Sequence, residues 1–479
     1  MNTTSFPVKE VSFYIIMLNR LQFQPVAIQH RANLQPYLRK HSQTCDRTFA
    51  NLFCWQHHYR VQWTEVDGWL VVRAHINGER KAAYIAISQE DIPDYTEIIP
   101  LLETDAMQND QPLSLMGLND DECALLQQQF PNAFVYDRNR DFADYIYQAD
   151  DLRMLKGRKY AQKRNHVNKF KSLYSYHYEP VTRHNIADCL QLEESWVAQH
   201  EHDESTRTEY DTIRRALHHF EELELLGGAL YVDRQIVAFT YGSAINDHIF
   251  CTHVEKGDIH YDGVYQMINH LFAQHIPEKY IYINREEDLG VPGLRKSKLS
   301  YEPEFLAYKT TALKLTSDMH DMVQLWNKCF GENDLSIYPF LSRYYFNHCS
   351  ISEKVDGKVV SMVFMIPCQT ELGLGAYLYG IATDPEYQHQ GISTKLIHKL
   401  LEKCKNSNCT FSFLIPAEQN LIDFYTRFGY QVTNTHVLFQ CDMDLGTGDT
   451  KKDRIIVLPL DETFRIENLP ETLECSPML

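Results

Sequence analysis

The chain has 479 residues, too many for one hydrophobic core, and its 44% hydrophobic and 23% charged residues are typical of a globular protein with about three domains. Its formal net charge of −18 repels nucleic acid and anionic membranes on average, so contact with either requires a local basic patch. The twelve cysteines form no Cys-x-x-Cys pair and lie in no cluster with zinc spacing. This pattern predicts reduced thiols, no bound metal and a cytoplasmic protein.

The predicted elements follow an N-terminal extension, residues 1–21. Its apolar stretch, Val11–Leu21, is far shorter than the ~20 apolar residues that a membrane-spanning helix needs. We therefore expect no integral membrane segment.

A turn dipeptide between β-favouring residues recurs at 66–71, 232–237 and 355–360. Each pattern predicts a β-hairpin. In the second and third regions the order of strand, turn, strand, turn, strand and helix is the same. The sequence therefore indicates two or three copies of one α/β unit.

The segment 153–171 carries eight Lys or Arg and no acidic residue. Such a patch can bind the phosphates of RNA or of a lipid headgroup, although a run of charges is more commonly a solvated helix face. Tyr160, Val167 and Phe170 interleave with the charges, which predicts a helix packed on one side and basic on the other. The candidate phosphate or RNA contacts are Lys163, Arg164, Asn165 and Lys169.

In the last third, a predicted strand over 377–383 leads into Gln388–Ser393 and a helix from about 392 to 404. Such a loop leaves several backbone N–H groups unpaired, and together with the positive end of the helix dipole they suit a pyrophosphate. Gly391 permits the close approach that a Cβ would block. By itself, the pattern is more typical of an ordinary strand-to-helix loop with a glycine.

Two later elements favour the pyrophosphate loop: a buried strand over Thr410–Pro416 and a helix over 421–430 with Gly429 as its C-cap. The stretch resembles the GNAT superfamily of N-acetyltransferases, whose Gln/Arg-x-x-Gly-x-Gly/Ala signature appears as Gln388–Ser393. The family's later element appears as Asn420, Phe424, Tyr425, Gly429 and Tyr430. Ser393 departs from the family, which has glycine or alanine there.

The resemblance implies an acetyl-CoA-dependent transfer by direct attack of an amine on the thioester. It implies that Tyr425 is the general acid that protonates the leaving thiolate. The residues that it implies for binding of acetyl-CoA are Ile381, Thr383, Gln388, His389, Gln390, Gly391, Ile392, Ser393 and Asn420. The general base stays open among Glu418, Tyr379, His389 and the terminal carboxylate. Trp326 and Phe330 can line an acceptor pocket or simply belong to the core.

Three segments carry a second resemblance, in chain order Thr48–Trp55, the basic segment 153–171 and Asn284–Lys296. Residues 22–310 resemble the soluble C-terminal domain of phosphatidylglycerol lysyltransferases, in which such segments occur in the same order. That domain consists of two GNAT-like subdomains related to peptidyltransferases that use aminoacyl-tRNA. The membrane helices of lysyltransferases are missing here, so an integral flippase role is not expected.

Within residues 22–310, the loop that corresponds to the pyrophosphate loop is His260–Tyr265. It contains an anion, Asp262, and a bulky Tyr265, so CoA binding is not expected there. Asp288 and Arg295–Lys296 are the site candidates of the 284–296 block, although this block can equally well cover a sheet edge.

The sequence thus predicts an α/β (α+β) protein of three GNAT-like mixed-sheet units in tandem. The predicted domains are 22–145 and 146–310, which form the lysyltransferase-like module, then the acetyltransferase domain 311–445 and a C-terminal tail, 446–479. The tail supplies a last strand at Arg454–Leu460 or hangs free. The leading function is acetyl transfer to an amine of a small molecule, peptide or protein. Two alternatives are an aminoacyltransferase that uses charged tRNA and a non-catalytic recognition arm, both located in the N-terminal module.

Overall fold

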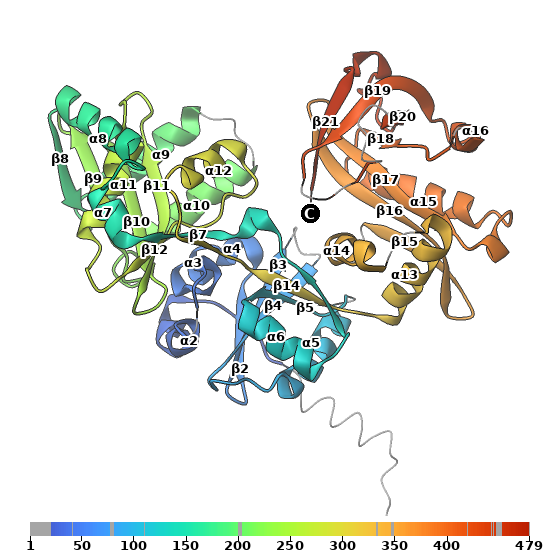
Figure 1. Cartoon of the computed structure of the whole chain (residues 1–479), viewed down its shortest axis with the longest axis horizontal. Coiled ribbons are helices and arrows are strands. Elements are labelled where there is room, and N and C mark those ends of the chain that lie inside the picture. The colour runs from blue at the N-terminus through green and yellow to red at the C-terminus, as the bar shows by residue number, and fades with distance from the viewer. Residues whose placement is uncertain are drawn as a thin grey trace, which may run out of the picture. The chain divides into compact units, whose positions relative to one another are not determined.

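The computed structural model contains three seven-stranded mixed sheets, each with helices packed on it (Figure 1). It describes residues 21–40, 42–76, 81–109, 111–199, 204–331, 334–345, 349–418, 420–441, 443, 445–446 and 453–478. The predicted N-terminal extension therefore lies, apart from Leu21, outside the described residues. Among the described helices, none combines the length and apolar character that a bilayer crossing requires. Three sheets of this kind confirm the predicted fold class.

The first sheet has the order β1-β2-β3-β4-β5-β14-β6. Its strands are β1 (Gln24–Pro25), β2 (Gln62–Val66), β3 (Trp69–Ile76), β4 (Lys81–Ser88), β5 (Ser114–Leu118), β6 (Phe134–Asp137) and β14 (Thr310–Lys314). The helices of this region are α2 (Arg31–Leu38), α3 (Phe49–Cys54), α4 (Gln56–Tyr59), α5 (Tyr95–Gln108) and α6 (Asp120–Gln129).

The second sheet has the order β13-β7-β12-β11-β10-β9-β8. Its strands are β7 (Asp144–Gln148), β8 (Tyr176–Pro180), β9 (Leu226–Val232), β10 (Gln235–Ala244), β11 (Ile249–Gly257), β12 (Tyr282–Asn284) and β13 (Phe305–Ala307). Its helices are α7 (Ala149–Met154), α8 (Ala161–Leu173), α9 (Ile186–Gln199), α10 (Glu204–His218), α11 (Val264–His275) and α12 (Pro292–Leu299).

The third sheet has the order β15-β16-β17-β18-β20-β19-β21. Its strands are β15 (Ser350–Val355), β16 (Lys358–Thr370), β17 (Gly373–Thr383), β18 (Phe411–Leu414), β19 (Gln431–Phe439), β20 (Arg454–Pro459) and β21 (Thr472–Pro477). Its helices are α13 (Ser317–Phe330), α14 (Asp334–Tyr344), α15 (Ile392–Asn406) and α16 (Asn420–Thr426).

Each of the three predicted turns joins two antiparallel strands, one pair in each sheet: β2–β3, β9–β10 and β15–β16. The two central residues of each turn have positive φ: Asp67 and Gly68, Asp233 and Arg234, and Asp356 and Gly357. This is the two-residue turn whose twist matches that of a hairpin. The hairpin is therefore the repeated local feature of the three sheets.

The apolar periodicity of α15 fixes how this helix packs. Leu396, Ile397, Leu400, Leu401 and Cys404 are all buried, at the spacing of one helix face. They share a core with Val363 and Met365 of β16. The helix begins immediately after Gly391, so the core contacts of α15 hold the Gln388–Ser393 loop at the end of β17.

The chain divides into two compact units. One holds the described residues up to Asn109 together with Leu113–Gln129 and Arg138–Thr311, and the other holds 110–112, Phe130–Asp137 and the described residues from Ala312 onward. The strand order differs from the expected segmentation at two places. β14, at the predicted start of the third domain, lies in the first sheet, and the predicted tail supplies β20 and β21 to the third sheet. Of the two alternatives for the tail, the structure has the strand near Arg454–Leu460.

Candidate acyl-CoA site and its counterpart in the second sheet

The third sheet opens between two parallel strands. β17 pairs with β18 only from Gly375 to Tyr377, where Tyr377 faces Phe413. β17 continues to Thr383 without a strand beside it on that edge among the described residues. A β-bulge opposite Val363 adds a residue at Gly380–Ile381 and bends this free portion. The backbone groups along the free edge are therefore available to an extended ligand.

The predicted pyrophosphate loop lies at the end of that free edge. Gly391 has φ +77° and is the N-cap of α15, and a Cβ built on it would meet no atom within 4 Å. Among the described hydrogen bonds, none is donated by the backbone N–H groups of residues 388–394. The Ser393 hydroxyl is 2.7 Å from the Thr383 hydroxyl, and the Gln388 amide donates to the Thr383 carbonyl over 3.2 Å. The loop is thus fastened to β17 while its backbone donors stay uncovered, the arrangement that suits an anion.

Tyr425 lies on α16 and is 7% exposed. Burial raises the pKa of its hydroxyl to about 12, so Tyr425 stays protonated at neutral pH. Its ring contacts the rings of Phe424 and Tyr430, and among the described residues its hydroxyl makes no hydrogen bond. A protonated hydroxyl of this kind can act as a general acid. α16 ends at Thr426, earlier than predicted, and Gly429 follows with φ +95°. The Asn420 side chain lies outside what the structure describes.

An aromatic cluster lies on β17, α13 and α14. The Tyr379 ring is 5.6 Å from Trp326 and 5.1 Å from Phe340, and the Phe330 ring lies 4.8 Å from that of Trp326, tilted by 58°. The other candidate bases are not part of this cluster: Glu418 and His389 are exposed, and the terminal carboxylate lies outside the described residues. The general base therefore stays open.

The corresponding loop in the second sheet is closed. Gly263 is the N-cap of α11 with φ +83°, much like Gly391 before α15. However, a Cβ on Gly263 would lie 2.7 Å from the carbonyl oxygen of His166, which belongs to α8. Asp262 beside it is paired with Lys169. The backbone of α8 thus covers the position that is open at Gly391.

The predicted basic helix is two helices, α7 and α8, because Leu155 and Gly157 between them have positive φ. Lys163, predicted as a phosphate contact, is buried and donates to the Ser300 hydroxyl over 2.6 Å, 4.0 Å from the centre of the Tyr301 ring. Burial and the nearby Arg285 lower the pKa of Lys163 to about 8.

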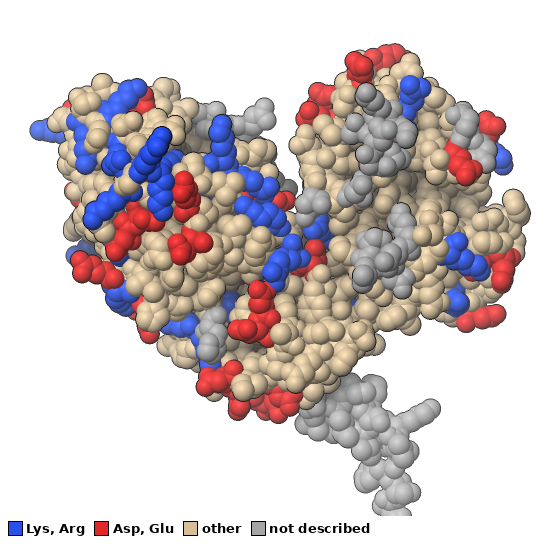
Figure 2. All heavy atoms as spheres, in the orientation of Figure 1, with Lys and Arg blue, Asp and Glu red and all other residues tan. Residues whose placement is uncertain are grey.

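The other predicted phosphate contacts differ in exposure and partners. Arg164 donates to the carbonyls of Leu155 and Gly157, Lys169 pairs with Asp262, and Asn165 is exposed. Figure 2 shows Lys and Arg side chains gathered over the part of the molecule that contains α8; exposed ones there include Lys156, Arg158 and Lys171.

Asp288 is fully buried, and its contacts are structural. Its carboxylate accepts from Arg295, Arg140 and the Tyr145 hydroxyl, and from the Gly290 amide. Burial alone would raise the pKa of Asp288, but these hydrogen bonds lower it to about 2. Asp288 therefore ties the 286–295 loop to β7 and to the chain before it, while Lys296 is exposed.

Sequence reasoning missed a buried polar seam inside the first unit. The ammonium group of Lys309 lies 2.8 Å from Asp144, 2.9 Å from Glu287 and 3.3 Å from Asp46. The Asp144 carboxylate accepts from the Cys45 amide over 2.7 Å and from the Asn284 side chain. Only the acidic run at 286–288 signalled this seam, because its other members come from distant parts of the chain.

Comparisons with known proteins agree with both halves of the chain. The family model of the C-terminal domain of phosphatidylglycerol lysyltransferase matches residues 39–312, and the acetyltransferase (GNAT) domain model matches residues 312–433. A conserved protein of unknown function from Bacteroides thetaiotaomicron is 39% identical, with a TM-score of 0.59, over 62% of this chain and all of that one. An uncharacterised protein of Mycoplasmoides gallisepticum is 24% identical over 236 residues, 47% of this chain and 73% of its own. The C-terminal domain of a putative lysylphosphatidylglycerol synthetase from Agrobacterium fabrum is 12% identical, with a TM-score of 0.44, over 61% of this chain and 92% of that one.

The first of these family models covers more than half of the chain, and the second begins where the first one ends. Both predicted resemblances are thereby confirmed. The chain belongs to the family defined by the C-terminal domain of phosphatidylglycerol lysyltransferase, and in it this domain is followed by a GNAT acetyltransferase domain.

Proposed function

We propose that the third sheet and its helices form an acyl-CoA-dependent N-acyltransferase that transfers an acetyl group from acetyl-CoA to an amine. The observation that supports this proposal most directly is the uncovered N-terminus of α15. The backbone N–H groups from Gln388 to Ser393 donate no hydrogen bond within the described residues, and the space beside Gly391 is open. Such donors suit the pyrophosphate of CoA.

The neighbouring elements fit the rest of the donor and the reaction. The free edge of β17, including Ile381 and Thr383, offers backbone groups to the amide-bearing pantetheine arm. The neutral amine attacks the thioester carbonyl carbon, the carbon–sulfur bond breaks, and the departing thiolate takes a proton from the Tyr425 hydroxyl. The amine nitrogen loses its proton to solvent, and solvent returns a proton to Tyr425. Because burial keeps Tyr425 protonated, the proton is in place when the thiolate leaves. In this proposal, the acceptor amine binds beside the aromatic cluster around Trp326.

The test is calorimetric titration of the full chain with acetyl-CoA, with Gly391→Trp and Gly357→Trp as matched variants. Both glycines have positive φ, +77° and +81°, and neither has a neighbour within 4 Å of a built Cβ, so the two substitutions strain the backbone alike. We expect micromolar binding by the wild type and by Gly357→Trp, and a loss of at least tenfold in Gly391→Trp. Equal binding by both variants, or no binding by the wild type, would refute the proposal.

Family membership supports a second candidate, aminoacyl transfer from charged tRNA by the first unit. The RNA contacts of this candidate are best sought at the exposed Lys156, Arg158 and Lys171, because Lys163 is buried. The test is tRNA binding by the full chain at several salt concentrations. Charge reversal at these three positions should weaken binding and reduce its salt dependence. If tRNA binding responds neither to the salt concentration nor to the charge reversals, aminoacyl transfer from charged tRNA is excluded.

A further inference from the structure

The second sheet opens at the same place as the third. β11 and β12 are parallel and pair from Ile249 to Cys251, where Cys251 faces Asn284. Two residues further along each chain segment lie His253 and Glu286, just as Tyr379 and Ile415 lie two residues past the last pair of the third sheet. The fold therefore does not require a thiol, an imidazole or a carboxylate at these positions. Cys251, His253 and Glu286 are specific to the second sheet.

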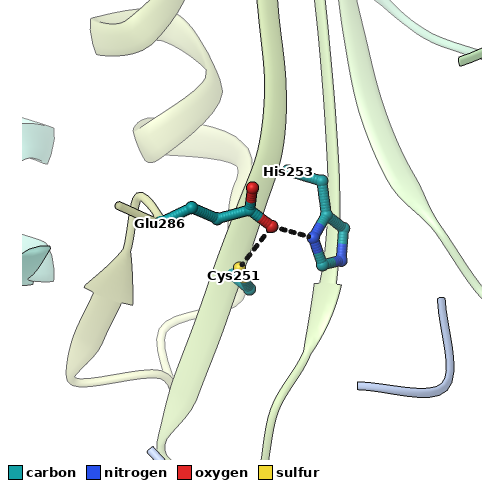
Figure 3. Close-up of side chains that lie close together, drawn as sticks. All are labelled: Cys251, His253 and Glu286. Carbon is teal, nitrogen blue, oxygen red and sulfur yellow. Dashed lines mark hydrogen bonds and ion pairs between the residues drawn. The ribbon is translucent and has the colours of Figure 1, made fainter. Parts of the chain in front are cut away.

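These three side chains converge on one point (Figure 3). The Glu286 Oε1 atom is 2.8 Å from His253 Nδ1 and 3.7 Å from the Cys251 sulfur, and one potential ligand atom from each of the three residues lies within 4.8 Å of the others. In a tetrahedral zinc site, nitrogen and oxygen ligands about 2.0–2.1 Å from the metal are about 3.3 Å apart, and a thiolate and an oxygen about 3.5 Å apart. The oxygen–nitrogen separation is thus about half an ångström shorter than in such a site, and the oxygen–sulfur separation about 0.2 Å longer.

Two further side chains orient the cluster. The Ser243 hydroxyl is 2.8 Å from His253 Nε2, and the Asn51 amide donates to Glu286 Oε1 over 3.0 Å. Histidine ligands of metals normally have their second ring nitrogen hydrogen-bonded in this way. A hydroxyl can accept as well as donate, so Ser243 can hold the Nε2–H tautomer that leaves Nδ1 free for a metal.

The Cys251 thiol lies close to several carboxylates, among them Asp144, Glu286 and Glu287. The carboxylates of Asp46, Asp144, Glu286 and Glu287 are accompanied by the ammonium groups of Lys298 and Lys309. Lys309 is shared by three of these carboxylates, those of Asp46, Asp144 and Glu287, and burial raises the pKa of Asp46 and of Asp144. The Lys298 ammonium group donates hydrogen bonds to the backbone carbonyls of Arg285 and Glu287.

The backbone at Glu286 is consistent with use of its carboxylate. Glu286 has φ +55°, a left-handed conformation that costs a side-chain-bearing residue about 1–2 kcal/mol. Glycine or asparagine would adopt it more easily. The side chain is 23% exposed, whereas that of His253 is 5% exposed, so Glu286 lies on the solvent side of the cluster.

We propose that Cys251, His253 and Glu286 bind one divalent cation of the zinc class at the opening of the second sheet. Binding releases the thiol proton of Cys251 to solvent, and the imidazole proton of His253 moves from Nδ1 to Nε2. Three protein ligands leave one coordination position open, as in zinc sites that exchange water for substrate. Spacing in the sequence predicted no metal because the ligands come from one strand and a loop 33 residues beyond it.

The experiment is equilibrium dialysis of the purified full chain against Zn²⁺, followed by metal analysis, with Co²⁺ as a spectroscopic probe. The wild type should retain about one Zn²⁺ per chain, and its Co²⁺ form should show the near-ultraviolet absorption of a thiolate–cobalt bond. Cys251→Ser should lose that absorption, and His253→Gln should lose at least nine-tenths of the bound metal. Cys54→Ala, which changes a buried cysteine of a hydrophobic core, should behave like the wild type.

A wild type that binds no stoichiometric Zn²⁺ or Co²⁺ would overturn the proposal, as would variants that keep both metal and cobalt–thiolate absorption. The wild-type cobalt spectrum tests the site even if a variant fails to fold. The result is independent of the CoA site, because Gly391→Trp should bind metal as the wild type does.

Discussion

Gly263→Ala tests whether α8 really closes the anion position of the second sheet. The substitution places a Cβ 2.7 Å from the His166 carbonyl oxygen and 3.3 Å from its carbon, both backbone atoms that cannot rotate away. Overpacking of this kind costs about 1–3 kcal/mol. The φ of +83° adds about 1–2 kcal/mol for a residue with a side chain. The first unit should therefore lose about 2–5 kcal/mol of unfolding free energy.

Gly68→Ala is the matched control, because Gly68 lies in the same unit, has φ +78° and has no neighbour within 4 Å of a built Cβ. It should cost only the backbone strain, about 1–2 kcal/mol. Calorimetric unfolding of the full chain measures both variants in the same cooperative transition. If Gly263→Ala lowers the unfolding free energy no more than Gly68→Ala does, then the His166 carbonyl of α8 does not occupy the space beside Gly263. The N-terminus of α11 would then be as open as that of α15 at Gly391.

Three further predictions concern other buried groups. Tyr425→Phe should lower kcat by about a hundredfold or more with little change in the KM for acetyl-CoA, measured as thiol release with a panel of amines. Because burial raises the pKa of Tyr425 to about 12, its ionisation should cause no fall in the wild-type rate below about pH 11. Lys163→Met should raise the unfolding free energy, and most strongly below about pH 8. The pKa of Lys163 is about 8 in the folded state and about 10.4 in the unfolded state, so the wild type gains stability as the pH rises between these values. In denaturation series across that range, the difference in unfolding free energy between variant and wild type should therefore shrink. Lys309→Met should lower the unfolding free energy by about 3–5 kcal/mol in the same measurement, because it leaves buried carboxylates such as Asp144 unpaired. The control is Lys159→Met, which removes the exposed ion pair of Lys159 with Asp151 and should cost less than ~1 kcal/mol.

The sequence predicted those features that depend on neighbouring residues. The three hairpins follow from turn dipeptides whose conformations only a few residue types adopt easily, and α15 follows from apolar residues at helical spacing. The Gln388–Ser393 loop could be predicted because a glycine lies between a strand pattern and a helix pattern. Its openness could not be found, because the same pattern occurs at Gly263, where another helix covers it.

Features that depend on distant pairing escaped prediction. β14 (Thr310–Lys314) joins β5 and β6 in the first sheet, although β6 ends as early as Asp137, so a local boundary near 310 could not assign it. Cys45 and Asp144 meet across 99 positions, and no spacing rule connects them. The basic segment misled for a related reason: its charges are visible in the sequence, but the left-handed Leu155 that breaks the helix is not.

The second and third sheets show how one architecture can serve different chemistry. Both open between two parallel strands, and both place a helix with a left-handed N-cap glycine after the first of them. In the third sheet the opening is flanked by aromatic and aliphatic side chains and the helix N-terminus is uncovered, which suits the pantetheine arm and the pyrophosphate of the proposed donor. In the second sheet the opening carries a thiol, an imidazole and carboxylates, and the helix N-terminus is covered by α8. Because α8 covers this helix N-terminus, the second sheet lacks the uncovered backbone donors on which the proposed acyl-CoA site of the third sheet rests. The two proposals, a CoA thioester at the third sheet and a divalent cation at the second, therefore have to be tested with different ligands.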